Sequence, residues 1–374
     1  MKIRTIVVSV GLCAMACGPK ADTVQPEPQP APVVEAPPAK PPAKPIPDGY
    51  HTLTPQLTVR GVDSALAFYE KALGAKRLFA MAGPDGKTMH AEIMIGDSIV
   101  MLDEENVAQG MKSPLALGGT SAGLLLYLAD ADAAFATAVA AGATAKMPVD
   151  EMFWGDRFGE VTDPFGHSWM VATHVEELTP EQMMERAAIL FPPAGKKPKK
   201  AKAAKKGEPP AWKKIAGTPA ASPIADGYHT VTPALTVDDA AGAIEFYKAA
   251  FGAVELARMP GPDGRLMHAE IKVGDSIVML SDESPMGSKS AKTLGGAALA
   301  LHMYTTDVDG AFARAVGAKA REVMPVAEMF WGDRYGAVVD AAGYLWGIAT
   351  HVEDLSPEAM MERMKAAQAK TPAS

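Results

Sequence analysis

The sequence is poor in cysteine and contains no long apolar run. Only two of its 374 residues are cysteine, which excludes a disulfide scaffold and any site built from several thiolates. No apolar run reaches the roughly 18 residues that a membrane-spanning helix requires. The formal net charge is only −8, and this modest acidity argues against a general nucleic-acid binder. With 48% hydrophobic residues, the composition is that of a globular protein whose length fits two ordinary domains.

The first seventeen residues have the pattern of a targeting signal. Lys2 and Arg4 form a short basic start, and an apolar run of about a dozen residues follows at 6–16. Small residues then precede Cys17, a pattern that resembles the lipobox of bacterial lipoproteins, in which this cysteine is lipidated and becomes the mature N-terminus. The alternative is an ordinary secretory signal cleaved nearby. On the lipoprotein interpretation the mature protein has no free thiol, so cysteine chemistry is excluded from its function.

Two proline-rich segments separate the remaining parts of the chain. Residues 18–47 contain eleven prolines and are expected to form an extended tether, which suits a domain held away from a membrane. Residues 192–223 contain nine lysines and seven prolines. This second segment is either an electrostatic patch for anionic lipid or polymer, or a solvated spacer between domains, and we favour the spacer.

A long internal repeat organises the rest of the sequence. Residues 48–103 and 226–281 are identical at 34 of 56 positions, at an offset of 178 residues. Farther along the offset becomes 177, where Glu151 to Arg157 recur as Glu328 to Arg334. A repeat of this length is a duplicated domain with its linker rather than a solenoid unit. We therefore expect a first domain at 48–191 and a second at 224–374.

The hydrophobic pattern predicts the same secondary structure in both copies. Alternating apolar residues indicate a half-buried strand at 52–59, and helical spacing indicates a helix at 62–73 that Gly74 ends. Turn signals then separate three more strands, and the same order of strand, helix and three strands recurs. The remaining elements of the first copy are predicted at 76–82, 87–95, 98–103, 122–129, 131–141, 144–149, 157–162 and 167–173. A closing helix is predicted from Thr179, with Gln182 completing a capping box.

Doubled units of this kind resemble the vicinal oxygen chelate superfamily, which includes glyoxalase I, extradiol dioxygenases and bleomycin-resistance proteins. The resemblance to its PhnB-like branch rests on Gly49-Tyr50-His51-Thr52, Met89-His90-Ala91-Glu92, Phe153-Trp154-Gly155-Asp156-Arg157 and Asp163-Pro164-Phe165-Gly166-His167. It implies an α+β fold of two tandem domains, each a doubled βαβββ unit that forms a cup-shaped mixed sheet. It does not imply one reaction, because the superfamily hosts many.

The resemblance also implies where a metal would bind, since metal-using members carry His, Gln or Glu at four strand positions of the cup. The aligned positions are Thr54, Met101, Gly123 and Met170 in the first domain, and Thr232, Met279, Ala300 and Gly347 in the second. None is a good ligand for a divalent ion. We therefore expect no metal and no other cofactor, with a divalent metal as the disfavoured alternative, and we expect Thr54, Met101, Met170, Thr232 and Met279 to contact a substrate instead.

Polar residues are nevertheless expected on the face of the cup. If Gly96-Asp97 is a two-residue hairpin loop, Glu92 lies opposite Met101 and His90 opposite Asp103, and all four share one face. The second copy has His268 and Glu270, but Ser281 in place of Asp103. These His and Glu residues are candidate catalytic groups and Asp103 a candidate substrate contact. A displaced metal site and a hydrogen-bonded structural pair are the alternatives.

Two loops contain further candidate binding residues. Trp154 and Arg157, with Trp331 and Arg334 in the second copy, can stack on a planar ligand and hold an anionic group. The alternative is an Asp–Arg pair and a tryptophan that anchor the loop.

Four histidines lie at strand ends that we expect to be close together. His51 and His229 precede the first strand of each copy, and His174 and His351 follow the last. These histidines either form a paired-histidine site or stabilise an edge or interface, and we favour the structural role.

Together these features predict a lipid-anchored protein of the bacterial cell envelope that faces the periplasm and binds a small molecule. The first hypothesis is metal-independent binding or sequestration, and the second is a lyase- or isomerase-type enzyme that uses His90 and Glu92. A purely structural envelope protein is the third. The expected partners are a small-molecule ligand and, through the lipid anchor, a membrane, but no nucleic acid. The two domains are expected to pair within the chain.

Overall fold

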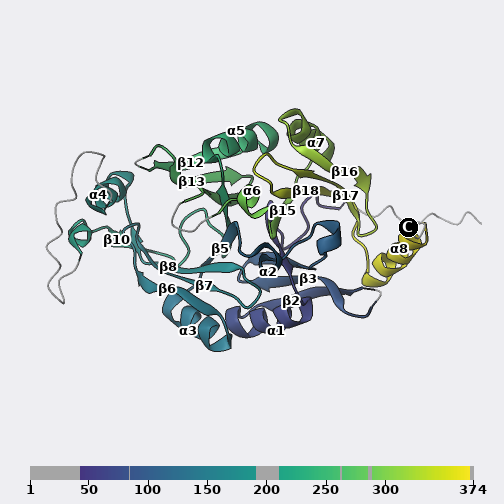
Figure 1. Cartoon of the computed structure of the whole chain (residues 1–374), viewed down its shortest axis with the longest axis horizontal. Coiled ribbons are helices and arrows are strands. Elements are labelled where there is room, and N and C mark those ends of the chain that lie inside the picture. The colour runs from purple at the N-terminus through teal and green to yellow at the C-terminus, as the bar shows by residue number, and fades with distance from the viewer. Residues whose placement is uncertain (1–42, 84, 191–209, 262, 285–288, 371–374) are drawn as a thin grey trace, which may run out of the picture. The chain divides into compact units, whose positions relative to one another are not determined.

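The computed structural model describes residues 43–83, 85–190, 210–261, 263–284 and 289–370. Four βαβββ modules follow one another along this part of the chain (Figure 1). In the first repeat they comprise β1 (Leu53–Val59), α1 (Val62–Leu73), β2 (Lys76–Ala82), β3 (Thr88–Ile95) and β4 (Ser98–Glu104), then β5 (Ala122–Tyr127), α3 (Ala131–Ala141), β6 (Thr144–Glu151), β7 (Asp156–Thr162) and β8 (Ser168–His174). The predicted order of elements is confirmed, and the predicted signal peptide and Cys17 lie outside the described residues.

The second repeat has the same succession of elements. Its modules comprise β11 (Val231–Val237), α5 (Ala240–Phe251), β12 (Val254–Pro260), β13 (Leu266–Val273) and β14 (Ser276–Asp282), then β15 (Leu299–Tyr304), α7 (Val308–Gly317), β16 (Arg321–Glu328), β17 (Asp333–Val339) and β18 (Leu345–His351). Short elements and closing helices complete the structure: η1 (Val107–Gln109), α2 (Pro114–Leu117), β9 (Glu176–Glu177), α4 (Pro180–Leu190), η2 (Ala211–Lys214), β10 (Thr218–Pro219), α6 (Ala291–Leu294) and α8 (Pro357–Lys370).

The modules pair crosswise between the two repeats. We name as sheet A the order β16-β17-β18-β15-β1-β4-β3-β2, which joins the first module to the fourth. Sheet B has the order β12-β13-β14-β11-β5-β8-β7-β6 and joins the second module to the third. At the seams, β1 pairs antiparallel with β15 and β11 pairs antiparallel with β5. Each sheet is therefore a doubled βαβββ unit, as expected, but it is built from half of each repeat.

Helices cover one face of each sheet. Helix α1 packs on β2, β3 and β4 of sheet A, and α7 packs on β16, β17 and β18 of the same sheet. Helix α1 also lies beside α3 of the same repeat, as Figure 1 shows at the lower edge of the molecule, and α5 lies beside α7. Apolar residues of α1, such as Leu66 and Tyr69, meet the buried residues Ile93 and Leu102 of the sheet. One hydrophobic core extends along the helix-covered faces of both sheets.

Buried tyrosine, tryptophan and aspartate side chains fix the helices to the last turn of each repeat. In the first repeat, Tyr69 Oη donates to Asp163 Oδ2 at 2.6 Å and Trp169 Nε1 donates to the same oxygen at 3.0 Å. The backbone N–H groups of Phe165 and His167 donate to Asp163 Oδ1, each at 2.9 Å. Asp340 makes the equivalent bonds with Tyr247 and Trp346 in the second repeat.

Part of the segment predicted to be a solvated spacer is folded. Its described residues, 210–223, include η2 and β10, and β10 pairs with β9. Trp212 is buried beneath the guanidinium of Arg186 on α4, 5.1 Å from its ring centre. Arg186 also pairs with Glu176 at 2.7 Å and donates to the carbonyl oxygens of Ile215 and Phe153. The capping box of α4 forms as predicted, since the backbone N–H groups of Thr179 and Gln182 each donate to the other residue's side chain.

Within the described part of the chain, no helix combines the length and the hydrophobicity that crossing a membrane requires.

Candidate functional site

The predicted polar cluster lies on the face of sheet A that is turned away from the helices, which we call cup A. The pairing of β3 with β4 places Glu92 opposite Met101 and His90 opposite Asp103, as predicted. Next to β4, strand β1 places Gln56 beside Met101. Because β1 also pairs with β15, residues of the second repeat complete the same face. Cup A therefore combines groups that lie about 200 residues or more apart in the sequence.

A chain of hydrogen bonds connects the polar groups of cup A. His90 Nδ1 donates to Asp103 Oδ1 at 2.7 Å, and His90 Nε2 lies 3.7 Å from Glu92 Oε1. Gln56 Nε2 donates to the other carboxylate oxygen of Asp103. The side chains of His90, Glu92 and Asp103 are 17–20% exposed, so they remain in contact with solvent although most of their surface is covered.

The electrostatics of this cluster make His90 a cation and Glu92 an anion near neutral pH. Burial lowers the pKa of His90, but its hydrogen bonds with Asp103 and Glu92 outweigh burial and raise the pKa to about 9. Burial raises the pKa of Glu92, but hydrogen bonds from His90 and Tyr50 outweigh it and lower the pKa. His90 and Glu92 therefore carry opposite charges near neutral pH, and His90 is a charged hydrogen-bond donor.

The raised pKa of His90 predicts how its contribution to stability depends on pH. A histidine whose pKa is raised on folding stabilises the folded state fully below its unfolded pKa, about 6.5, and loses this effect as pH rises through its folded value, about 9. We therefore expect His90→Gln to lower the free energy of unfolding by about 2 kcal/mol more at pH 6 than at pH 9.5. Urea unfolding of both proteins at the two pH values measures this. An equal loss of unfolding free energy in His90→Gln at both pH values would contradict this prediction.

His302 of β15 is the residue of cup A that the sequence analysis missed. It pairs with Thr54 across the seam between the repeats, and its side chain is buried. Its Nε2 atom has no hydrogen-bond partner among the described residues. The ring stacks on Tyr335, with centres 5.7 Å apart, and burial lowers the pKa of His302 to about 4, so the imidazole is neutral. The available signal was that Leu125 of the first repeat becomes His302 in the second.

The structure corrects the grouping of the four positions at which the resemblance places metal ligands. Crosswise pairing puts Thr54 and Met101 in cup A with Ala300 and Gly347, rather than with Gly123 and Met170. Neither grouping offers a donor set that fits a divalent ion. At Gly347 a Cβ atom would lie 2.7 Å from the ring of Tyr335, so this ring fills the space where a ligand side chain would stand. In sheet B, Met170 approaches Gly123 in the same way.

The corresponding face of sheet B, which we call cup B, is less polar. His268 Nε2 lies 2.8 Å from Glu270 Oε1, so this pair is kept. Four other groups of cup A are replaced at the equivalent positions. Cup B has Ala234 in place of Gln56, Ser281 in place of Asp103, Leu125 in place of His302 and Phe158 in place of Tyr335. Thr232 and Met279 occupy the places of Thr54 and Met101 in this cup. The two cups have therefore diverged in chemistry on a shared backbone.

The two loop arginines lie on the opposite face from the cups. The guanidinium of Arg157 forms two hydrogen bonds with Asp132 of α3, at 2.6 and 2.7 Å, and Arg334 does the same with Asp309 of α7. Strand β7 begins at Asp156, so alternation directs Arg157 toward the helix. The structure thus shows the Asp–Arg pairing that was the structural alternative for this loop.

The tryptophans and the later histidines of these loops gather around a buried aspartate at the rim of each cup. Trp154 Nε1 donates to Asp156 Oδ2 at 3.0 Å, Tyr127 Oη donates to the same oxygen at 2.8 Å, and His174 Nδ1 lies 2.7 Å from Oδ1. In the second repeat the same arrangement is formed by Trp331, Tyr304 and His351 around Asp333. His51 and His229 lie together elsewhere, at the seam between the repeats.

Comparison with known proteins connects both repeats with one family. Residues 50–171 and 228–348 each match the model of the Glyoxalase/Bleomycin resistance protein/Dioxygenase superfamily. An uncharacterised protein of Mycobacterium bovis is 44% identical over 138 residues, which cover 36% of this chain and 91% of that protein. The protein YjdN of Escherichia coli is 27% identical over 140 residues, which cover 32% of this chain and 92% of that protein.

A solved structure shares the fold over both repeats. The crystal structure of glyoxalase I from maize (Zea mays) is 13% identical, covers 86% of this chain and 97% of its own, and superimposes with a TM-score of 0.53. At this identity the likeness concerns the fold alone.

Proposed function

Since the chain belongs to the Glyoxalase/Bleomycin resistance protein/Dioxygenase superfamily, we propose that cup A binds a small molecule without a metal at the family's four strand positions. The observation that carries this proposal is the buried Nε2 atom of His302, which has no hydrogen-bond partner within the described residues. A buried polar atom without a partner destabilises a fold by about 1–3 kcal/mol, so its presence on this face of the sheet favours a ligand that satisfies it.

The charges of cup A favour a ligand that carries hydrogen-bond donors or a positive charge. Glu92 and Asp103 supply two carboxylates, and His90 supplies one positive charge, so the cluster has a net negative charge. The neutral imidazole of His302 adds one further polar atom. Tyr335 beside it offers an aromatic surface against which a planar group can stack.

The charge state of His90 favours binding over base catalysis. A general base must accept a proton, but the hydrogen bonds with Asp103 and Glu92 keep His90 protonated near neutral pH. A lyase- or isomerase-type reaction would instead use His90 as the acid and Glu92 as the base. Turnover that is lost in His90→Gln, measured once a ligand is known, would support this second candidate. A purely structural protein would show neither binding nor turnover.

Exchanging single residues between the cups tests the binding proposal. His302→Leu introduces the residue that cup B carries at the same position, so the backbone is known to accommodate it. Metal-free bleomycin, which is cationic, and a panel of small aromatic amines serve as probes in thermal-shift screening and calorimetry. We expect a probe that binds the wild type to bind His302→Leu about 10-fold more weakly, since one hydrogen bond is lost.

The matched control is Glu160→Ala, which places in cup B the residue that cup A carries at the equivalent position. This control should leave binding in cup A unchanged. Equal affinities of both variants and the wild type for every probe that binds would contradict the proposal.

We further propose that the protein is a lipoprotein of the PhnB-like branch, anchored through Cys17 in the bacterial cell envelope and facing the periplasm. The basic start, the apolar run and the small residues before Cys17 support the anchor, and the duplicated motifs around His51, His90 and Trp154 support the branch. Fractionation of Cys17→Ser tests the anchor, because unchanged membrane association would contradict it.

A further inference from the structure

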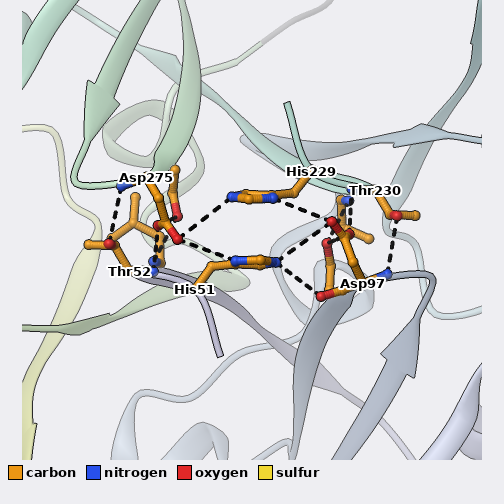
Figure 2. Close-up of polar contacts among 10 residues, drawn as sticks. His51, Thr52, Asp97, His229, Thr230 and Asp275 are labelled. Carbon is orange, nitrogen blue, oxygen red and sulfur yellow. Dashed lines mark hydrogen bonds and ion pairs between the residues drawn. The ribbon is translucent and has the colours of Figure 1, made fainter. Parts of the chain in front are cut away.

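The two repeats meet at a reciprocal contact between hairpin turns and strand beginnings, shown in Figure 2. The turn between β3 and β4 brings Asp97 to the second repeat, where its Oδ1 accepts the backbone N–H of Thr230 at 2.8 Å. The turn between β13 and β14 brings Asp275 to the first repeat, where its Oδ1 accepts the backbone N–H of Thr52 at 2.8 Å. Each aspartate thus uses one oxygen for the interface and directs the other toward its centre.

Two histidines fill the centre of this contact. The rings of His51 and His229 stack with their centres 3.4 Å apart and their planes 14° from parallel. One end of the stack faces Asp97 and the other faces Asp275. Both imidazoles are 22% exposed, so solutes can reach them.

The contacts at the Asp97 end indicate where a neutral form of each ring carries its proton. Both nitrogens of His51 face oxygens that only accept: Nε2 lies 3.0 Å from the main-chain oxygen of Asp97 and Nδ1 lies 3.3 Å from Asp275 Oδ2. A neutral ring donates to only one of them, and the shorter contact favours the proton on Nε2. His229 Nδ1 lies 3.4 Å from Asp97 Oδ2, and a carboxylate likewise only accepts. A neutral imidazole has one N–H group, so the ring nitrogens at the other end of the stack carry lone pairs.

Three electron-rich atoms therefore meet at the Asp275 end. His51 Nδ1 lies 3.3 Å and His229 Nε2 3.9 Å from Asp275 Oδ2, and all three atoms lie within 4.8 Å of one another. His229 Nε2 is buried and has no hydrogen-bond partner in the described part of the chain. Asp275 Oδ1 accepts the backbone N–H of Thr52 and the hydroxyl group of Ser276, and Oδ2 faces the two rings. Such a group of acceptors lacks a cation.

A metal ion fits this group better than protons do. Protonating both rings would place two positive charges 3.4 Å apart. Zinc binds imidazole nitrogen and carboxylate oxygen at about 2.0–2.2 Å, so neighbouring ligands of a tetrahedral ion lie about 3.3–3.6 Å apart. The two ring nitrogens lie 3.3 and 3.9 Å from Asp275 Oδ2. An ion lies in the plane of each imidazole that binds it, so binding tilts the stacked rings apart.

We propose that His51 Nδ1, His229 Nε2 and Asp275 Oδ2 bind one divalent transition-metal ion of the zinc type at the seam between the repeats, with water as the fourth ligand. The site is separate from both cups, and its ligands come from both repeats. The ion connects the beginning of β1 to the turn between β13 and β14, so binding stabilises the contact between the two repeats.

Metal titration of the full chain tests this proposal. After treatment with a chelator and dialysis, we expect one Zn²⁺ per chain by elemental analysis, a rise in Tm on adding Zn²⁺, and visible absorption bands typical of nitrogen and oxygen ligands on adding Co²⁺. His229→Gln and Asp275→Asn should each weaken binding by more than the roughly 10–100-fold that loss of an outer-shell partner produces. Asp275→Asn keeps an oxygen for the Thr52 N–H, and circular dichroism establishes that each variant is folded.

Two matched controls locate the ion. Asp97→Asn changes the carboxylate at the other end of both rings, outside the proposed ligand set, so it should weaken binding by no more than the roughly 10–100-fold of an outer-shell partner. His90→Gln changes a histidine of cup A and should bind one Zn²⁺ with the affinity of the wild type. Absence of stoichiometric binding to the folded wild type would overturn the proposal. A loss of binding in Asp97→Asn as large as that in Asp275→Asn would overturn the ligand set, and loss in His90→Gln would place the metal in the cup.

Discussion

Replacing Asp163 with alanine is expected to lower the free energy of unfolding by about 4 kcal/mol, the largest effect of any single exchange discussed. Its carboxylate accepts hydrogen bonds from Tyr69 Oη, Trp169 Nε1 and the backbone N–H groups of Phe165 and His167. Tyr69 and Trp169 are fully buried, so no water replaces the lost acceptor. Urea unfolding followed by circular dichroism measures the change.

The matched control for this exchange is Asp85→Ala. Asp85 also accepts a backbone N–H in a turn, that of Lys87 at 3.1 Å, but it is exposed, so its loss should lower the stability by only about 0.5 kcal/mol. In the Asp163→Ala background, Tyr69→Phe should restore part of the stability because it removes the unpaired hydroxyl group. Strictly additive effects of the two exchanges would show that the hydrogen bond between them contributes nothing.

Gly96→Ala is expected to lower the free energy of unfolding by about 3 kcal/mol, through two effects of similar size. Gly96 lies in the turn between β3 and β4 with a φ of +60°, which disfavours any side chain. A Cβ atom here would also lie 2.8 Å from Thr230 Cβ in the other repeat, where the two halves of the molecule meet. The melting temperature and the urea midpoint of the variant measure the combined effect.

Gly74→Ala separates the backbone effect from the contact effect. Gly74 ends α1 with a φ of +65°, close to that of Gly96, and nothing lies within 4 Å of its added Cβ atom. This exchange should lower the stability by only about 1 kcal/mol. If both variants lost the same stability, the contact with Thr230 would have no energetic role in joining the repeats.

The local structure was predictable because local patterns determine it. The prediction of a helix at 62–73 is confirmed to the residue, since apolar spacing marks its length and Gly74 ends it in the left-handed conformation. The two-residue turn at Gly96-Asp97 fixed the register of β3 and β4, and with it the shared face of His90, Glu92 and Asp103. Short-range turn chemistry therefore placed the polar cluster correctly on one face of the cup.

The crosswise pairing of modules could not be predicted from the sequence. Strand β1 can pair with β5 of its own repeat or with β15 of the other, and the two partners have nearly the same apolar pattern because the repeats are copies. No residue in β1 distinguishes them. For this reason the sequence analysis grouped Thr54 with Gly123 and Met170, whereas the structure places it opposite His302.

Two other differences have local causes. Strand β7 contains Arg157, as predicted, but the alternation of strand residues directs its side chain toward α3 instead of the cup. His302 was overlooked because it lies two residues beyond the aligned ligand position, Ala300. Strand residues two apart point to the same side, so His302 also lies on the face of the cup.

The crosswise sheets also impose an order on folding. Sheet B closes when β5 meets β11, at Ala122 and Leu235, whereas sheet A closes when β1 meets β15, at Leu57 and Leu299. The chain between the partners is about 110 residues long in the first case and about 240 in the second, so sheet B has the smaller loss of chain entropy. During synthesis β15–β18 are also made last, and until then one edge of β1 remains without its partner. Cup A, with His90 and His302, is therefore the last part of the molecule to form.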